Sequence, residues 1–249
     1  MSRSWEKYLS ERDRMLAWGK PGDARDGFGS RPVVLQIDNY YAAVGIERED
    51  VVQSRKKWGA SAGLEGWAAI DKTVDLLRAA RANGVPVIHA LNTGKSDHEQ
   101  YGARGARLSS TPRERTPLAI TPEERMKGYD PIEEVKPLPG EMVIMKASAS
   151  AFLGTSLVMQ LNYLEADTVI CCGEATSGCV RATVVDGAMY RYRMAVVEEC
   201  TYDHEEAPHF INLFDMHARN ADVVFLDETI AYLDSIGAKN GVGAAAMTR

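Results

Sequence analysis

The chain has 249 residues, 45% of them hydrophobic, which is enough to bury one substantial core. Its formal net charge of −6 and isoelectric point near 5.5 argue against a nucleic-acid-binding surface. The four cysteines form no Cys-x-x-Cys pair, so neither a disulfide framework nor a zinc ribbon is expected. The first residues are charged, and no apolar run approaches the length of a membrane span. We therefore expect a cytoplasmic protein with neither nucleic acid nor membrane among its partners.

Residues 1–30 are predicted to form an N-terminal extension. Apolar side chains such as Trp5, Leu9 and Leu16 favour a helix over residues 4–18. Residues 20–30 contain Gly, Pro and charged residues and favour a loop. Such an arm either packs on a neighbouring subunit or folds back on its own core, and we expect a homo-oligomer, a dimer or a tetramer.

Strand and helix patterns alternate over the rest of the chain. Apolar, β-branched runs predict strands at residues 32–38, 85–91, 141–146, 168–172, 194–198 and 222–226. Helical spacing of apolar residues predicts helices over residues 66–83, 155–164, 179–191 and 209–220. This order is interrupted by two irregular stretches, the aromatic-rich residues 39–62 and the polar residues 92–130. The second stretch is long for a loop in a compact domain, and such long loops tend to be functional.

The alternation predicts an α/β fold of three layers, α/β/α, with a six-stranded, mainly parallel sheet covered by helices on both faces. We expect one main domain over residues 31–236 and a flexible, Gly/Ala-rich C-terminal tail over residues 237–249.

One cysteine stands at a predicted junction between strand and helix. The run Thr168–Cys172 reads as a buried strand, and Cys179 follows a turn that begins at Gly173. At such a junction, backbone N–H groups and the helix dipole lower a thiol pKa and can hold a developing oxyanion. These local features predict a nucleophile, and they leave open an ordinary half-buried cysteine.

Two further reactive groups stand at predicted strand ends. Asp38 ends the first strand and Lys146 ends the third. In open parallel sheets, ligands bind beyond the carboxyl ends of the strands. Asp38 could also cap a helix, and Lys146 could lie on the surface, where lysine is usually found.

The residues around these three groups resemble the motifs of the isochorismatase-like cysteine hydrolases. Gly173-Glu-Ala-Thr-Ser-Gly-Cys179-Val-Arg-Ala-Thr183 is similar to the nucleophile motif of that family. Lys146-Ala-Ser-Ala-Ser-Ala-Phe-Leu-Gly-Thr155-Ser-Leu157 and Leu35-Gln-Ile-Asp38 are similar to its other two motifs. The resemblance covers roughly residues 31–235 and is closest to the N-carbamoylsarcosine amidohydrolase branch. It implies the strand order 3-2-1-4-5-6.

The resemblance also implies a mechanism that needs no cofactor. Cys179 attacks the amide carbonyl of a small-molecule substrate, Asp38 moves the proton, and Lys146 holds Asp38 ionised. The N–H groups of Cys179 and Ala175 form the oxyanion hole, and the Glu174–Ala175 peptide bond is cis. By sheet spacing, however, Lys146 lies two strands from Asp38, about 10 Å away, and must reach across to meet it.

The residues after the second strand do not favour a metal. Nicotinamidases of the family bind a metal there through an Asp and two His, whereas this chain has only the pair Asp97-His98. We therefore expect no metal and no nicotinamide substrate.

Several residues are candidates for contact with the substrate. In the branch that this chain resembles, an arginine after the fifth strand binds the substrate carboxylate, and by register His204 stands in its place. A neutral histidine favours a neutral or hydroxylated amide, with Arg181 as the alternative cation. Tyr40, Tyr41 and Trp58 either wall the pocket or pack ordinarily, and Thr176 and Glu174 are further candidates beside Cys179.

The predicted function is that of a cysteine amidohydrolase acting on a linear C–N bond of a small molecule: a carbamoyl, formamido or carboxamide group. Four alternatives stay open: an amidase acting on a carboxylate such as maleamate or N-carbamoylsarcosine, a non-enzymatic binding protein, a vinyl-ether hydrolase, and a redox protein using Cys171 and Cys172. In this family the vinyl-ether hydrolases lack the cysteine. Alternate residues of a strand face opposite sides of its sheet, which disfavours the redox pair.

Overall fold

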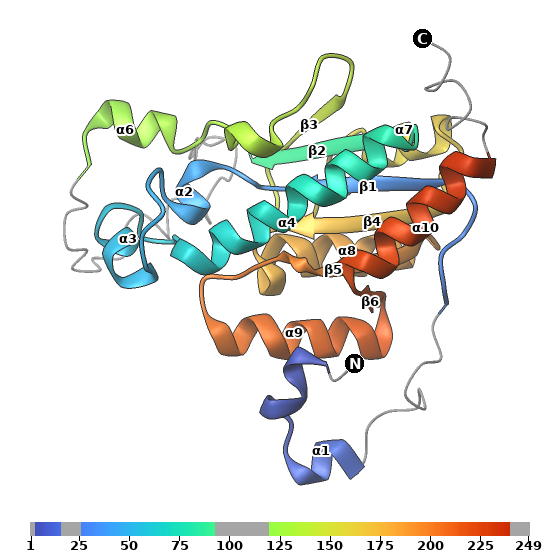
Figure 1. Cartoon of the computed structure of the whole chain (residues 1–249), viewed down its shortest axis with the longest axis horizontal. Helices are drawn as coiled ribbons and strands as arrows, with labels where there is room; N and C mark the ends of the chain where they lie inside the picture. The colour runs from blue at the N-terminus through green and yellow to red at the C-terminus, as the bar shows by residue number, and fades with distance from the viewer. Residues whose placement is uncertain (1–2, 16–25, 93–119, 240–249) are drawn as a thin grey trace.

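A computed structural model of the chain describes residues 3–15, 26–92 and 120–239 (Figure 1). Six strands form one sheet in the order β3-β2-β1-β4-β5-β6, and every neighbouring pair is parallel. The prediction of strand order and fold class is therefore confirmed. The strands are β1 (Pro32–Ile37), β2 (Val87–Asn92), β3 (Met142–Lys146), β4 (Thr168–Gly173), β5 (Arg193–Thr201) and β6 (Asp222–Val224).

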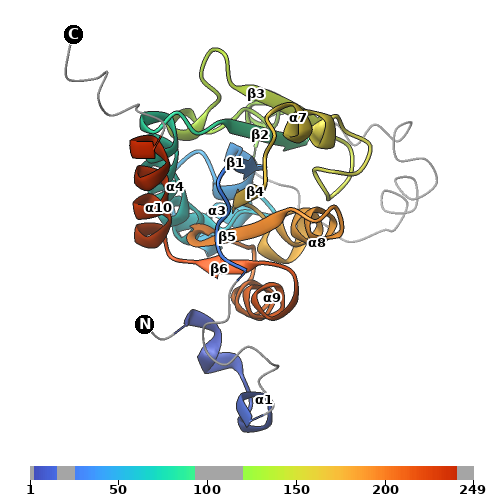
Figure 2. The same ribbon diagram turned by 90° about the vertical axis from the view of Figure 1, so that its right-hand side faces the viewer.

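Helices cover both faces of the sheet, and the view along it in Figure 2 shows the three layers. On one face lie α4 (Gly63–Ala82) and α10 (Leu226–Lys239), with a buried core around Val34, Ile70 and Leu77. On the other face lie α7 (Leu157–Tyr163), α8 (Arg181–Met189) and α9 (Glu206–Arg219), with a core around Leu35, Leu161 and Leu213. The central strand β1 is buried along its whole length because both cores press on it.

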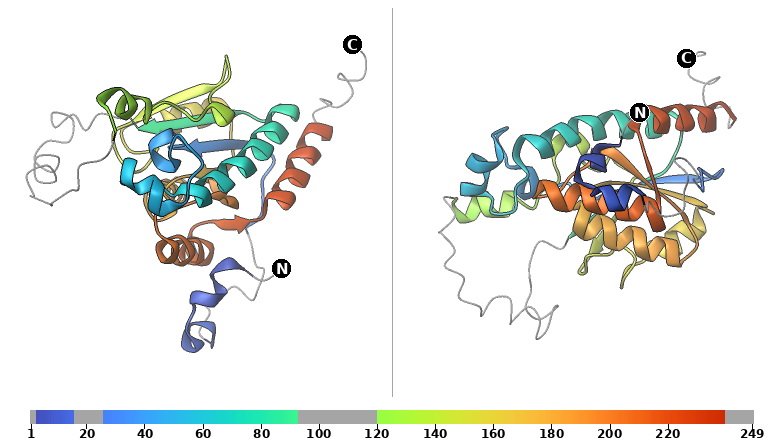
Figure 3. Two further views of the ribbon diagram at one scale, coloured as in Figure 1. Left: turned by 60° about the vertical axis from the view of Figure 1, so that its left-hand side comes forward. Right: turned by 90° about the horizontal axis from the view of Figure 1, so that it is seen from below.

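Several segments differ in detail from the predicted elements. The N-terminal extension forms two short helices, η1 (Ser4–Tyr8) and α1 (Glu11–Met15), instead of one; residues 16–25 lie outside the described part. Ser10 separates them because its backbone and side chain both bond to Asp13. The segment η1 packs on α9, with Tyr8 stacked on Phe210, while α1 projects away from the body (Figure 3).

Three further helices fall inside stretches that were expected to be irregular: α2 (Tyr41–Val44), α3 (Val51–Lys57) and α6 (Pro122–Lys127). Asp50 starts α3 by accepting hydrogen bonds from the N–H groups of Val52 and Gln53. A short 3-10 helix, η2 (Glu133–Val135), precedes β3. The sequence also missed α10, which begins at Leu226, a residue assigned to the sixth strand, and continues to Lys239, past the expected boundary at residue 236.

In the described part of the chain, no helix has both the length and the apolar composition needed to span a bilayer.

Candidate active site

The carboxyl ends of β1, β2, β3 and β4 meet at one edge of the sheet. Asp38 follows β1 directly, and its backbone has a φ of 53°. This left-handed conformation is uncommon for a residue with a side chain, although aspartate tolerates it better than most. Such outliers cluster at functional sites, and here the turn holds the carboxylate among the ends of the neighbouring strands.

Gly173 lets the end of β4 approach β1 closely. A Cβ at this position would collide with the carbonyl oxygen of Ile37, and the φ of 111° also favours glycine. The N–H of Glu174 donates to the same Ile37 oxygen at 3.0 Å. The close approach brings the residues after β4 beside Asp38.

Cys179 lies in the turn that follows. The Glu174–Ala175 peptide bond is cis, as the resemblance implied. Residues Thr176–Val180 then form a wide π-helical turn, η3, and α8 begins only at Arg181. The predicted helix start at Cys179 is therefore two residues early, and the cysteine lies in the turn ahead of α8.

Asp38, Lys146 and Cys179 form one cluster. The Nζ atom of Lys146 lies 2.6 Å from Oδ2 of Asp38 and 3.3 Å from Sγ of Cys179. The Lys146 side chain spans the end of β2, the strand that separates it from β1, so the 10 Å separation of the strands is closed. The N–H of Asn92 at the end of β2 donates to Oδ1 of Asp38 at 2.9 Å, and Nζ of Lys146 also donates to the Ser148 carbonyl at 3.2 Å. Lys146 and Asp38 are both fully buried.

The electrostatics of the cluster differ from the local prediction for the thiol. Burial, followed by the charge of Asp38, raises the pKa of Cys179 to about 12, and Lys146 offsets only part of this. This direction is opposite to the lowered thiol pKa that the junction predicted, because burial of the sulfur and then the charge of the Asp38 carboxylate both raise the pKa. Burial opposes the charge on Lys146, but Asp38 and Cys179 outweigh it and raise the pKa of Lys146.

The N–H group of Ala175 is available beside the nucleophile. The carbonyl of Ala175 accepts hydrogen bonds from the N–H groups of Gly178 and Val180, at 2.9 and 3.1 Å, and these bonds hold the turn. Among the described residues, no acceptor is bonded to the Ala175 N–H itself. A free N–H four residues before the nucleophile fits the geometry of an oxyanion hole.

Three of the predicted substrate-contacting residues gather near the catalytic cluster. Tyr40 is close enough to Glu174, Asp38 and Cys179 that burial and their charges raise its pKa far above the ordinary value. Glu174 is buried, and its Oε2 lies 3.7 Å from Nε2 of His204.

The other aromatic candidates and Thr176 have different surroundings. Tyr41 packs on Trp67, and its hydroxyl accepts a hydrogen bond from the N–H of Glu133. Trp58 is buried beside Gly45. The contact with Trp67 turns Tyr41 toward α4, a placement that an expected loop could not reveal. Thr176 is buried, with Oγ1 bonded to the Tyr202 carbonyl and to Nδ1 of His209.

Comparison with known proteins supports the resemblance. Residues 49–228 match the Isochorismatase domain family. The chain belongs to the isochorismatase family. It is 34% identical over 220 residues to maleamate amidohydrolase from Pseudomonas putida, a match that covers 87% of this chain and 91% of that protein. It is 30% identical over 215 residues to N-carbamoylsarcosine amidase from an Arthrobacter species, which covers 85% of this chain and 75% of that protein.

Solved structures of the isochorismatase family have the same fold. The crystal structure of a cysteine hydrolase from Pseudomonas syringae pv. phaseolicola superposes with a TM-score of 0.67 at 19% identity. The superposition covers 83% of this chain and 93% of that one.

Sequence reasoning missed the residues that hold the η3 turn and the neighbouring segment after β5 in place. Oδ2 of Asp203 accepts the N–H of Ser177 at 2.6 Å, and Oδ1 accepts the N–H of His204 at 2.7 Å. His209, whose pKa burial lowers to about 4, bonds Thr176 at 2.8 Å as a neutral ring. Arg55 of α3 donates to the carbonyls of Ser61 and His204. Asp203 had a signal in the sequence because it is adjacent to His204 after the fifth strand, and His209 had one because Ala207-Pro208-His209 resembles part of the family's closing segment.

The remaining sequence candidates lie elsewhere. Arg181, the alternative cation for a substrate carboxylate, pairs with Asp215 of α9 at 3.2 Å. His89 is buried between Gln36 and Glu141, and the pair Asp97-His98 falls outside the described residues. The described residues contain no group of three or more His, Cys, Asp or Glu side chains that could hold a metal ion.

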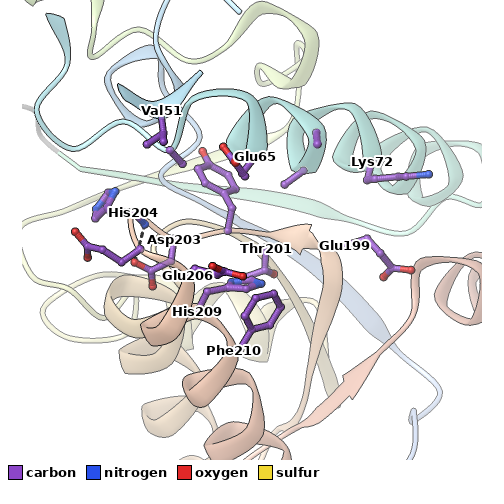
Figure 4. Close-up of a pocket in the computed structure, with 15 residues that line it drawn as sticks. Val51, Glu65, Lys72, Glu199, Thr201, Asp203, His204, Glu206, His209 and Phe210 are labelled. Carbon is purple, nitrogen blue, oxygen red and sulfur yellow. Dashed lines mark hydrogen bonds between the residues drawn. The ribbon is translucent and has the colours of Figure 1, made fainter. Parts of the chain in front are cut away.

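A cavity of about 660 Å³ lies between α4 and α9 (Figure 4). Glu65 and Lys72 of α4 line one side, and His209 and Phe210 of α9 line the other. His204 lines this cavity and also lies next to Glu174. Asp38, Lys146 and Cys179 do not line the cavity. Two residues that line the cavity, Asp203 and His209, also bond Ser177 and Thr176. The cavity therefore adjoins the turn that carries Cys179.

Proposed function

We propose that the protein is a cysteine amidohydrolase that cleaves a linear C–N amide bond of a small molecule through a thioester intermediate. One observation carries the proposal: the 2.6 Å contact between Lys146 and Asp38, with the sulfur of Cys179 at 3.3 Å from the same Nζ atom. The chain's relatives include proteins named maleamate amidohydrolase and N-carbamoylsarcosine amidase, which supports the reaction class.

Each group has a defined task in this mechanism. Asp38 takes the proton of the Cys179 thiol as the sulfur forms a bond to the amide carbonyl carbon. The N–H groups of Ala175 and Cys179 hold the oxyanion of the tetrahedral intermediate. The C–N bond breaks, and the leaving nitrogen takes the proton back from Asp38. Water then attacks the thioester with Asp38 as its base, which releases the acid and restores the thiol.

The raised thiol pKa sets the timing of the first step. With a pKa of about 12, the free thiolate is scarce at neutral pH, so proton transfer to Asp38 must accompany attack on the carbonyl. The charge of Lys146 next to both groups then stabilises the thiolate character of the sulfur as the proton leaves.

Two matched variants test the mechanism. Cys179→Ala removes the nucleophile, and we expect no release of ammonia or amine from amides that the wild type cleaves, with the fold intact. Asp38→Asn should be nearly as damaging, because no general base remains. Mass spectrometry of the quenched wild type should show the acyl group on the peptide that contains Cys179. Substantial turnover by Cys179→Ala would exclude covalent catalysis.

The alternatives are distinguished by the same cluster. A non-enzymatic binding protein would not need Asp38, Lys146 and Cys179 together, and a vinyl-ether hydrolase would not need the cysteine. The alternative of a carboxylate substrate is favoured by the 34% identity to maleamate amidohydrolase, and a comparison of maleamate with maleamide as substrates decides it.

We further propose that the protein is a cytoplasmic homo-oligomer. Its four cysteines are free thiols, as in a reducing compartment. Apolar side chains of the edge strand β3 and of α7 are exposed, including Val143, Met145 and Met159. Light scattering coupled to gel filtration should give the mass of a dimer or tetramer, and cell fractionation should recover the protein with cytoplasmic markers.

A further inference from the structure

Glu174 is a buried carboxyl group that the proposed mechanism does not use. It is 5% exposed, and the hydrogen bond from its N–H to the Ile37 carbonyl holds it beside Asp38. Its next residue is Ala175, whose N–H is the proposed oxyanion donor. The Oε2 atom receives no hydrogen bond in the described part of the chain, and Nε2 of His204 lies 3.7 Å from it. A buried oxygen without a partner is costly, so such a group calls for an explanation.

Ionisable groups from three segments surround this carboxyl group. Burial and the charges of Asp38 and Asp203 raise its pKa to about 8, while the Tyr40 hydroxyl and Lys146 lower it. At neutral pH, Glu174 is therefore mostly an uncharged acid, which offers one O–H donor and one carbonyl acceptor. The charged and titratable groups that face it are Asp38 and Tyr40 after β1, Lys146 of β3, and Tyr202, Asp203 and His204 after β5.

We propose that Glu174, together with His204, determines substrate specificity. The two residues bind an uncharged hydrogen-bonding group on the substrate, such as a second carboxamide, a ureido group or a hydroxyl, and they disfavour a carboxylate at the same position. The proposal rests on the amidohydrolase function and names the class of amide that it takes. A carboxamide has one donor face and one acceptor face, and it can pair with a carboxylic acid through two hydrogen bonds.

The charges around Glu174 explain why a carboxylate would bind poorly. Lys146 already pairs with Asp38 at 2.6 Å. The guanidinium of Arg55 lies next to His204, but it already donates hydrogen bonds to the Ser61 and His204 carbonyls. It also pairs with Glu205 at 3.4 Å. Among the described residues, no free cation remains for a substrate carboxylate beside Glu174, which would thus be desolvated near Asp38 and Asp203.

The test compares diamides with the monoamides that carry a carboxylate instead. The pairs are oxamide and oxamate, malonamide and malonamate, succinamide and succinamate, and maleamide and maleamate. Ammonia release gives kcat/KM for the wild type, and calorimetry with Cys179→Ala gives binding of pairs that are not turned over. The variants are Glu174→Gln, which keeps an uncharged group of the same shape, and Glu174→Ala, which removes it. Glu65→Gln on the exposed surface of α4 is the matched control.

We expect the wild type to favour the diamide of each pair that it accepts by at least tenfold. Glu174→Gln should keep this preference within about threefold, Glu174→Ala should lower it about tenfold, and Glu65→Gln should leave it unchanged. Above pH 8 the ionised Glu174 loses its donor, so the diamide kcat/KM of the wild type should fall there, while that of Glu174→Gln should not.

Three results would overturn the proposal: a preference of the wild type for the monoamides, an unchanged preference in Glu174→Ala, or binding of neither member of any pair to Cys179→Ala. These results differ from a failure of the amidohydrolase function itself. That failure would appear as no ammonia release by the wild type from any amide, or as release that persists in Cys179→Ala, whereas a wrong role for Glu174 leaves Cys179-dependent release intact. Thermal unfolding of each variant shows that the fold is retained, and Glu174→Gln serves as the readout if Glu174→Ala does not fold.

Discussion

Replacement of Lys146 by methionine tests whether the buried ion pair is a catalytic device with a structural cost. Methionine keeps most of the length of the side chain and removes the charge that lies 2.6 Å from Asp38. Both side chains are fully buried, so Asp38 is left as an uncompensated charge. Removal of one partner of a buried pair typically costs about 3–5 kcal/mol of unfolding free energy. For a chain of this length, each kcal/mol corresponds to roughly 2–4 °C in Tm.

A second substitution separates the stability effect from the catalytic one. Asp38→Asn combined with Lys146→Met removes both charges, so the double variant should regain much of the stability that Lys146→Met loses. Neither variant should turn over substrate at more than a small fraction of the wild-type rate. The matched control is Lys136→Met, which breaks an exposed pair with Glu133 and should change the unfolding free energy by less than about 1 kcal/mol.

The pH dependence gives a further check on the origin of the loss. Burial already raises the pKa of Asp38 above its ordinary value, and loss of Lys146 raises it further. A carboxyl group whose folded pKa lies above its unfolded pKa destabilises the fold at high pH, and this penalty disappears as the pH falls through the folded value. Urea unfolding followed by tryptophan fluorescence should therefore show a smaller loss for Lys146→Met at pH 5 than at pH 8. A loss below 1 kcal/mol at pH 8, with no recovery in the double variant, would refute the energetic coupling.

Four other predictions follow from the site and its surroundings. Iodoacetamide should label Cys179 in preference to the fully buried Cys171 and Cys172, and faster labelling of either strand cysteine by peptide mapping would contradict the assignment. His204→Arg should raise kcat/KM for maleamate relative to maleamide by about tenfold, because each charge-assisted bond contributes about 1.5–3 kcal/mol. A ratio that stays at the wild-type value would mean that the side chain at position 204 does not contact the substrate. Chelation should leave the rate unchanged, since the residues after β2 lack the metal motif of the nicotinamidases, and a loss restored by zinc or iron would show otherwise. Glu141→Gln should lower the unfolding free energy by about 2 kcal/mol at pH 7, and equal urea midpoints at pH 7 would contradict this. Burial raises the pKa of Glu141, but Arg81, the Leu138 N–H and His89 bring it to about 2. The stability is therefore present above pH 4.5 and lost as the pH falls toward 2.

The sheet and the catalytic cluster were predictable because they depend on local and periodic signals. Buried strands such as β1 (Pro32–Ile37) carry mainly β-branched and apolar residues, and each of the three proposed catalytic groups follows or ends a strand. Parallel strands bring those ends to one edge whatever the loops do. The 10 Å gap between β1 and β3 could not be resolved in this way, because only the conformation of the Lys146 side chain across β2 closes it.

The short helices that were missed depend on contacts rather than on pattern. The short helices α2 and α3 begin at Tyr41 and Val51, and each has fewer than eight residues, too few for a reliable period. Their packing turns Tyr41 toward Trp67 and leaves Tyr40 beside Glu174, although the two tyrosines are adjacent in the sequence. Which of two neighbouring aromatic residues faces the site is therefore a tertiary property.

The charge state of the nucleophile shows the same limit most clearly. A cysteine ahead of a helix predicts a lowered thiol pKa from the helix dipole alone. In the folded protein, burial and the carboxylate of Asp38 act in the opposite direction and bring the pKa of Cys179 to about 12. Asp38 is 141 residues away in sequence, so no local reading can include it. In the proposed mechanism, Asp38 therefore takes the thiol proton as the sulfur attacks the amide carbonyl, and no standing thiolate is required.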